Sequence, residues 1–177
     1  MTITHLLLTG FRGCGKSAVG QLLSVSLSRK LIDIDLVIES STGKSIADLF
    51  SEVGHEGFRD LESAQIEDLV SFRESAVISL GGGAILRPEN RKCIRKLGKT
   101  VWLQATPETI LDRISNDKTT QSRRPKLSKL GDMEEIRSIL EMRIPWYNEV
   151  ADLAVSTDDK SMECVAEIIA DWFHRIT

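Results

Sequence analysis

The chain has 177 residues, 41% of them hydrophobic and 28% charged, as expected for one globular domain spanning residues 1–177. A net charge of -3 and a pI near 5.7 argue against a polyanion such as a nucleic acid as partner. Since no apolar run approaches the roughly 20 residues of a membrane span, and three scattered cysteines suit neither disulfides nor zinc, we expect a cytoplasmic protein that binds no membrane.

Five apolar runs of strand length alternate with longer segments of helical periodicity. The runs are Ile3–Leu8, Leu31–Asp35, Ala76–Leu80, Thr100–Gln104 and Leu153–Ser156. This alternation predicts an α/β protein, a three-layer α/β/α fold whose five-stranded parallel sheet is covered on both faces. Ser45 is expected to cap a helix that begins at Ile46 and ends at Gly54.

The segment 10–17, which we call the phosphate loop, matches the pattern G-x-x-x-x-G-K-[ST] directly after the first run. Its glycines are Gly10, Gly13 and Gly15. Glycine permits positive φ, so successive N–H groups can turn toward a phosphate at the N-terminus of the next helix. Lys16 is placed to reach the β and γ phosphates, and the Ser17 hydroxyl to ligate Mg²⁺. The alternative is a ligand-free glycine-rich turn, and Cys14 is interpreted as incidental rather than redox-active.

Two carboxylates, Asp33 and Asp35, end the second apolar run. The period of two in a strand puts both on the same side at the strand exit, where ligands of such sheets collect. One could hold Mg²⁺ through water while the other accepts a proton from a substrate hydroxyl. A pair of solvated acids is the alternative.

The third run is followed by three glycines, Gly81, Gly82 and Gly83, which we call the glycine turn. Without side chains, a ligand can lie against the backbone there and use its N–H groups. A plain tight turn explains the same residues.

Two arginines are candidates for binding a carboxylate. Arg59 lies three residues before Glu62 and Arg143 four residues before Tyr147, both in helical patterns. Converging arginines would form a planar, bidentate clamp. A surface ion pair and a solvated helix face account for the spacings equally well.

Residues 115–131 are polar and basic, and they lack the periodicity of either regular element. The segment is long for a connection, which predicts a mobile lid or a solvated loop.

In this order the motifs resemble the shikimate kinase family, small enzymes of the phosphate-loop NTPase fold that are similar in organisation to nucleoside monophosphate kinases. The resemblance is carried by residues 10–17, Asp33-Ile34-Asp35, residues 58–62, residues 79–83, Arg124-Pro125, and Arg143 with Tyr147. It covers most of the chain, and the joint order of the motifs is its specific part.

The resemblance implies ATP and shikimate as substrates, Mg²⁺ as the metal, a monomer, and a role in chorismate biosynthesis. The implied nucleotide contacts are Gly13, Cys14, Gly15, Lys16, Ser17, Ala18 and Arg124. The implied shikimate contacts are Asp35, Arg59, Gly81, Gly82, Gly83 and Arg143, with an acceptor-binding helical segment at about 36–71. The implied metal site is Ser17 with Asp33 acting through the metal's water shell, and the implied catalytic residues are Lys16, Asp35 and the lid residue Arg124. Glu62 would fix Arg59, and Tyr147 would pack rather than touch substrate.

Two positions depart from the family pattern: Ala18 replaces a frequent threonine and Lys126 a frequent leucine. The second leaves open whether Arg123 or Arg124 contacts phosphate. The turn 156–158 is expected to meet the adenine. Another small-molecule kinase of this fold, for gluconate or a nucleotide, and a catalytically silent nucleotide-binding module are the alternative functions.

Overall fold

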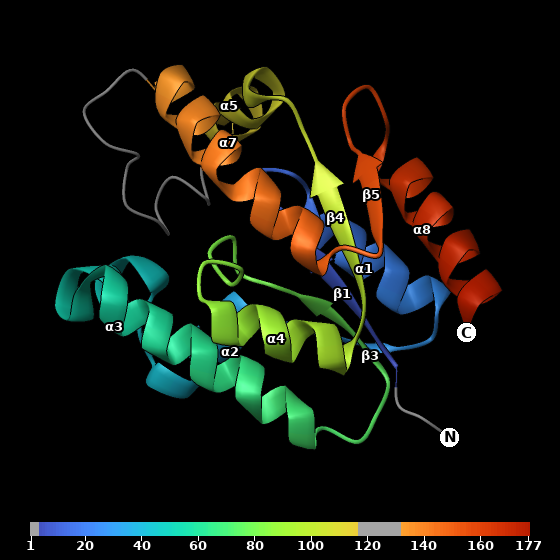
Figure 1. Ribbon diagram of the computed structural model, residues 1–177, viewed down its shortest axis with the longest axis horizontal. Helices are drawn as coiled ribbons and strands as arrows, with labels where there is room; N and C mark the ends of the chain where they lie inside the picture. The colour runs from blue at the N-terminus through green and yellow to red at the C-terminus, as the bar shows by residue number, and fades with distance from the viewer. Residues whose placement is uncertain (1–3, 117–131) are drawn as a thin grey trace.

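A computed structural model describes residues 4–116 and 132–177 of the protein (Figure 1). Its sheet has five strands, all parallel, in the order β2-β3-β1-β4-β5. The strands are β1 His5–Thr9, β2 Lys30–Asp33, β3 Ala76–Ser79, β4 Gly98–Gln104 and β5 Leu153–Ser156. The predicted five-stranded parallel sheet is therefore confirmed, with strand ends that differ from the expected ones by at most two residues.

Helices connect the strands and cover both faces of the sheet (Figure 1). They are α1 Lys16–Ser26, α2 Ile34–Thr42, α3 Ile46–Asp68, the 3₁₀ turn η1 Leu69–Ser71, α4 Pro88–Leu97, α5 Pro107–Asn116, α7 Asp132–Val150 and α8 Met162–Ile176. Helices α2 and α3 with η1 fill the predicted helical segment at 36–71.

Strand β1 shows why the fold has three layers. Leu6 and Leu8 pack into the core beneath α1 and α8, whereas Leu7 packs into the core shared with α3, α4 and α7. Successive side chains of a strand point to opposite faces, so a continuous apolar run buries both faces. All three leucines are fully buried, which confirms the predicted α/β/α architecture.

The strand order brings the predicted site segments to one edge of the sheet. β1 lies in the middle, between β3 and β4, and its carboxyl end runs into the phosphate loop. The exits of β2 and β3 lead into Asp33 and into the glycine turn. In open parallel sheets, ligands bind where these carboxyl ends meet.

The structure corrects three local expectations. β2 ends at Asp33, so Asp35 lies in the first turn of α2 rather than on the strand, because the Asp33 carboxylate caps the helix by accepting from the Asp35 and Leu36 amides. Gly54 does not end the helix that Ser45 caps; it takes φ 69° and ψ -174°, and α3 resumes beyond it. Residues 115 and 116, expected in the lid, belong to α5. In the described ranges 4–116 and 132–177, no helix is both long and apolar enough to cross a membrane.

Candidate active site

The phosphate loop takes the backbone conformation that its glycines predict. Gly10, Gly13 and Gly15 have φ of 145°, 85° and 96°. Gly15 stands at the N-cap of α1, where no side chain caps the helix, so the first amide groups of α1 are left for an external acceptor. A helix N-terminus of this kind attracts a phosphate through its dipole and its N–H groups.

Lys16 is held across the phosphate loop. Its Nζ donates to the carbonyls of Gly10 and Phe11, at 2.9 Å each, and lies 3.8 Å from the Cys14 Sγ. Cys14 is fully buried, and its amide donates to the Phe11 carbonyl at 3.3 Å. Cys14 thus serves the internal structure of the loop, whereas Ala18 is exposed and lines the cavity described below.

Ser17 and Asp33 come together as a candidate magnesium site. The Ser17 hydroxyl donates to the Asp33 Oδ2 at 2.9 Å, while the other carboxylate oxygen caps α2. Among the described residues, no group of three or more His, Cys, Asp or Glu side chains could hold a metal. One hydroxyl and one carboxylate oxygen beside a phosphate site fit Mg²⁺, which is commonly bound by few protein ligands, substrate phosphates and water.

Asp35 lies beside the glycine turn. A Cβ at Gly81 would be 3.1 Å from the Asp35 Oδ1 and would overlap the Glu62 carboxylate. Glycine at this position therefore leaves room for two carboxylates of the protein itself. The contact of Gly81 with a ligand, expected from the sequence, stays a prediction.

Arg59 and Glu62 form an ion pair across one turn of α3. The Glu62 side chain is 0% exposed and that of Arg59 is 12% exposed, so the pair is buried rather than a surface contact. A Cβ at Gly83 would overlap the Arg59 guanidinium, which therefore lies directly on the glycine turn. Breaking such a pair leaves a buried charge without its partner, which is strongly destabilising.

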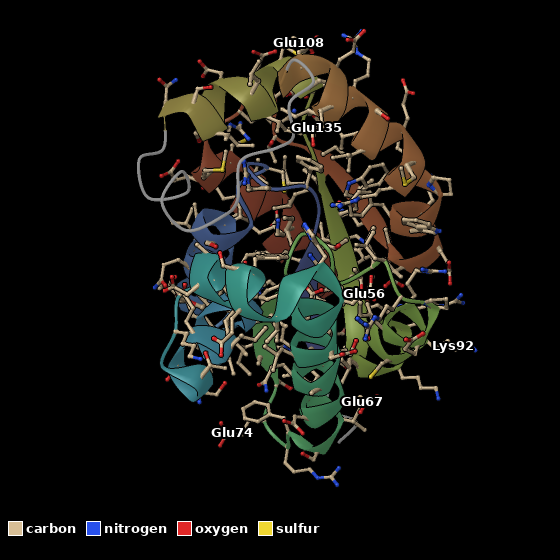
Figure 2. The ribbon with its side chains drawn as sticks, turned by 90° about the vertical axis from the view of Figure 1, so that its left-hand side faces the viewer. Glu56, Glu67, Glu74, Lys92, Glu108 and Glu135 are labelled. Carbon is tan, nitrogen blue, oxygen red and sulfur yellow. The ribbon has the colours of Figure 1, made fainter. Side chains whose placement is uncertain are left out.

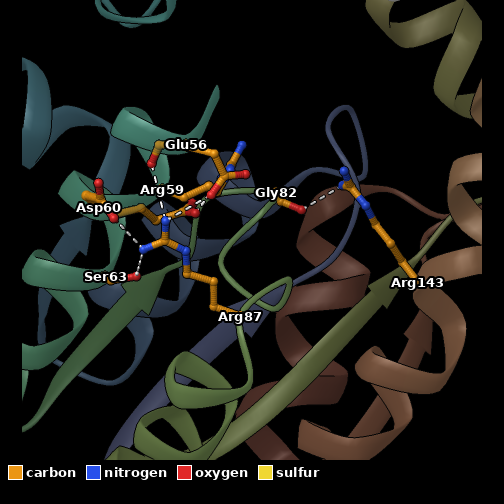
Figure 3. A network of polar contacts seen from close by, with 8 residues as sticks. Glu56, Arg59, Asp60, Ser63, Gly82, Arg87 and Arg143 are labelled. Atoms are coloured by element: carbon orange, nitrogen blue, oxygen red, sulfur yellow. Dashed lines mark hydrogen bonds and ion pairs between the residues drawn. The ribbon is translucent and has the colours of Figure 1, made fainter. Parts of the chain in front are cut away.

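Arg143 reaches the same turn from α7. Its Nη1 donates to the Gly82 carbonyl at 2.9 Å, and its guanidinium carbon lies 5.5 Å from the centre of the Phe11 ring. Figure 3 shows Arg59 and Arg143 approaching the turn from different elements. The two arginines that sequence spacing alone could not connect therefore meet at one backbone segment, Gly82–Gly83.

A cavity of about 900 Å³ extends from the phosphate loop to Asp35. Its lining includes Lys16, Ser17, Asp33, Asp35 and Leu80. Its volume lies at the upper end of the range for small-molecule sites, which suits two adjacent ligands. Arg59 and Arg143 are not part of the lining; they stand beside the glycine turn that follows Leu80.

Tyr147 is a packing residue, as the sequence interpretation had it. It is fully buried and stacks on Trp102, with ring centres 5.1 Å apart. Burial raises the pKa of its phenol above the ordinary value, partly offset by the nearby Arg143 charge.

Sequence reasoning did not single out Arg113 or Met162. Both line the cavity at the end away from Asp35. Arg113 donates to the Thr157 hydroxyl and carbonyl at 2.9 Å each, and to the Gly13 carbonyl at 3.3 Å. One sequence signal could have indicated Arg113 as a site residue. It is a cationic residue between the core positions Ile110 and Ile114, in the helix that starts soon after β4.

The turn 156–158 is fixed to the start of α5. The Asp158 carboxylate accepts from the Thr106 amide at 3.1 Å and from the Ser156 hydroxyl at 3.2 Å. Burial opposes ionisation of Asp158, but hydrogen bonds from Thr109, Thr106 and Ser156 bring its pKa below the ordinary value. This turn is joined through Arg113 to the Gly13 carbonyl of the phosphate loop, and its contact with the adenine stays a prediction. Residues 117–131, with Arg123, Arg124 and Lys126, lie outside the described residues.

Comparison with known sequences gives a consistent result. The family model described as shikimate kinase matches residues 12–173. A shikimate kinase of Rhodopirellula baltica is 44% identical over 166 residues, covering 93% of this chain and 88% of the relative. The shikimate kinase of Thermus thermophilus is 41% identical over 173 residues, covering 97% and 91%.

Comparison with solved structures points the same way. A shikimate kinase of Acinetobacter baumannii, solved in complex with shikimate, superposes with a TM-score of 0.91 at 31% identity, covering 99% of this chain and 96% of that one. A gluconokinase of Sinorhizobium meliloti reaches a TM-score of 0.59 at 16% identity and shares the fold alone.

Proposed function

The chain belongs to the shikimate kinase family, and we propose that it transfers the γ-phosphoryl group of ATP to the 3-hydroxyl of shikimate, forming shikimate 3-phosphate and ADP. The observation that carries the proposal is the single cavity that joins the phosphate loop to Asp35. A kinase must hold donor and acceptor in line, and one continuous cavity with a phosphate cradle and a carboxylate base allows this.

On the donor side, Lys16 would exchange the Gly10 and Phe11 carbonyls for phosphate oxygens. The Ser17 hydroxyl and, through water, the Asp33 carboxylate would hold Mg²⁺, which would supply positive charge beside the phosphates. The amide groups at the start of α1 add fixed donors that need no reorganisation during the reaction.

On the acceptor side, Asp35 would accept the proton of the attacked hydroxyl as the new oxygen–phosphorus bond forms and the bond to ADP breaks. We assign the shikimate carboxylate to Arg59 and Arg143, because planar guanidinium groups bind carboxylates bidentately and both already lie at the glycine turn. Gly81, Gly82 and Gly83 would lie under the ring, and the helices of segment 36–71 would carry Arg59.

Arg124 is proposed as the lid contact to the transferring phosphate, on the strength of the family motif. Arg124→Ala should lower kcat far more than it weakens ATP binding, with Arg123→Ala as the matched control. Equal losses in both variants would contradict the choice of Arg124.

The test is ADP release from ATP and Mg²⁺ with shikimate, gluconate or a panel of nucleoside monophosphates as acceptor. We expect turnover with shikimate only, and a loss of about 10²–10⁴-fold in Asp35→Asn, the range for a general base. Asp68→Asn, an exposed acid at the end of α3, is the control. Turnover with another acceptor would keep the phosphoryl chemistry and discard the carboxylate clamp, and nucleotide binding without turnover would favour a silent module.

We further propose that the enzyme works as a monomer in the cytoplasm and binds neither nucleic acid nor membrane. The net charge of -3 supports the absence of nucleic-acid binding, since a polyanion would be repelled. Light scattering at working concentrations tests whether the enzyme is a monomer.

A further inference from the structure

Arg87 connects the end of the glycine-turn loop to α3. Its Nη1 donates to the Asp60 Oδ1 at 2.7 Å and to the Ser63 hydroxyl at 3.4 Å. Its Nη2 donates to the Glu56 carbonyl at 3.3 Å and to the Glu56 Oε2 at 3.2 Å. Figure 3 shows the Arg87 guanidinium among Glu56, Asp60 and Ser63, close to Arg59.

The three partners of Arg87 share one face of α3. Glu56, Asp60 and Ser63 are spaced four and three residues apart, so they stack along the helix. The Glu56 and Asp60 side chains are 90% and 72% exposed, and each ion pair alone stabilises little. A planar group that holds four acceptor atoms along the helix instead restricts how far α3 can slide or rotate.

A kink in the backbone separates the part of α3 that Arg87 contacts from the first part of the helix. Gly54, with φ 69° and ψ -174°, interrupts the helical conformation just before Glu56. The capped start of α3 at Ser45 therefore does not by itself set where Arg59 lies. Figure 2 looks onto α3 and shows Glu56 and Glu67 on this second part of the helix.

Two arginines thus link the same two segments in opposite directions. Arg59 extends from α3 onto Gly83, and Arg87 extends from the loop beyond Gly83 back to α3. Arg59 lies next to Asp60 in the sequence, so any shift of Asp60 relative to the loop moves Arg59 relative to the turn.

We propose that Arg87 is a positioning residue for acceptor binding: it fixes the second part of α3 against the glycine turn, so that the Arg59 guanidinium is presented to the acceptor carboxylate beside Arg143. Arg87 itself touches neither substrate. The inference rests on the proposed function, where Arg59 is assigned to that carboxylate.

The experiment measures kcat, KM for shikimate and KM for ATP in the wild type, Arg87→Ala, Arg87→Lys and the control Lys99→Ala. Lys99→Ala removes another partly exposed ion pair, the one with Asp152, near the start of β4 and away from the site. Arg87→Ala should raise KM for shikimate about tenfold with KM for ATP and kcat within about twofold, since tenfold corresponds to only about 1.4 kcal/mol of binding. Arg87→Lys should raise KM for shikimate less than Arg87→Ala does, because the positive charge is kept. Its KM should still exceed that of the wild type, because an ammonium cannot hold Glu56 and Asp60 at once as the planar guanidinium does.

A double-mutant cycle separates positioning from a general structural role. If Arg87 acts through Arg59, adding Arg87→Ala to Arg59→Ala should change kcat/KM for shikimate by less than about twofold, because the effects of two residues are not additive when one acts through the other. The same penalty in both backgrounds, or an unchanged KM for shikimate in Arg87→Ala, would overturn the inference. So would parallel losses in kcat and in both KM values together with a lower melting temperature.

Asp60→Asn provides a second variant that leaves Arg87 intact, and it should raise KM for shikimate in the same direction by a smaller factor. An unchanged KM in Asp60→Asn and in Arg87→Lys would overturn the inference even if Arg87→Ala failed to fold. A wild type without shikimate-dependent turnover would overturn the proposed function and the inference with it. Turnover in the wild type with unaltered variants would overturn the inference alone.

Discussion

The proposed donor and acceptor sides of the active site are built in different ways. The phosphate loop is one contiguous segment in which backbone groups are proposed to do most of the binding, and its conformation follows from Gly10, Gly13 and Gly15. The acceptor side gathers side chains from three distant segments: Asp35, Arg59 with Glu62, and Arg143. A backbone site can be recognised as a local motif, whereas a side-chain site depends on how the whole chain folds.

The largest effect is expected on the donor side. Lys16→Met should lower kcat about 10³-fold, because removing one preorganised donor from developing charge typically costs 10²–10³-fold. Its KM for shikimate should change little. Lys30→Met, an exposed lysine at the start of β2, is the control, and steady-state kinetics is the measurement. A loss of less than about tenfold would mean that phosphate charge is neutralised without Lys16.

On the acceptor side, Gly83→Ala is expected to raise KM for shikimate by about 10–100-fold, since a methyl group would displace the Arg59 guanidinium and a misplaced contact can cost that much. KM for ATP should be nearly unchanged. Gly43→Ala has open space around its Cβ but a φ of 67°, so it should cost stability without this kinetic effect. Equal increases in KM for shikimate and KM for ATP in Gly83→Ala would contradict the separation into a donor side and an acceptor side.

Substitution of Tyr147 probes the packing between the two sides. Cys14 of the phosphate loop and Glu62 of α3 both influence the pKa of its phenol. The folded protein raises its pKa, so the stabilisation is complete below the unfolded value of about 10 and is lost as pH rises beyond it, by up to about 1.4 kcal/mol per pH unit. It is the only tyrosine of the chain, so phenolate absorbance reports on it alone. Native protein at pH 11 should show little phenolate until it unfolds, and Tyr147→Phe should remove this part of the pH dependence. A phenolate signal from native protein near pH 10 would contradict the burial argument.

The smallest expected effect comes from helix caps. The Ser45 hydroxyl accepts from the Asp48 amide at 3.1 Å, and Ser45→Ala should lower the free energy of unfolding by about 1 kcal/mol. Ser161→Ala removes the corresponding cap of α8, where the hydroxyl accepts from the Cys164 amide at 3.2 Å. Urea denaturation should show similar losses in both variants, with KM for shikimate unchanged in both, because Gly54 separates the capped start of α3 from Arg59. A raised KM for shikimate in Ser45→Ala would mean that the first part of α3 also positions Arg59.

The same contrast explains what the sequence could and could not predict. Alternation of apolar runs and helical periods was enough for the sheet, since both faces of each strand are buried. The role of Asp33 as a helix cap was missed. A strand that continues two residues further and a helix that is capped at Asp33 have the same apolar pattern at that point.

The glycine turn and the side chains of Arg59, Glu62 and Arg143 were named from the sequence, but their direct contacts with the turn were not predicted. Gly81 and Gly83 make room for Glu62 and Arg59, which approach from α3, about twenty residues earlier in the chain. The contacts of Arg87 were not predicted for the same reason, because its hydrogen-bond acceptors lie 24 to 31 residues away in the sequence. Contacts of this kind leave no periodic trace in the sequence.

The contacts of Lys16 have a consequence for nucleotide affinity. Its ammonium already spans the Gly10 and Phe11 carbonyls, so the side chain is ordered before any ligand arrives. Recruiting it to a phosphate exchanges two neutral acceptors for an anionic one and freezes few additional rotamers. The ordering of Lys16 itself should therefore add only a small entropic penalty to nucleotide binding.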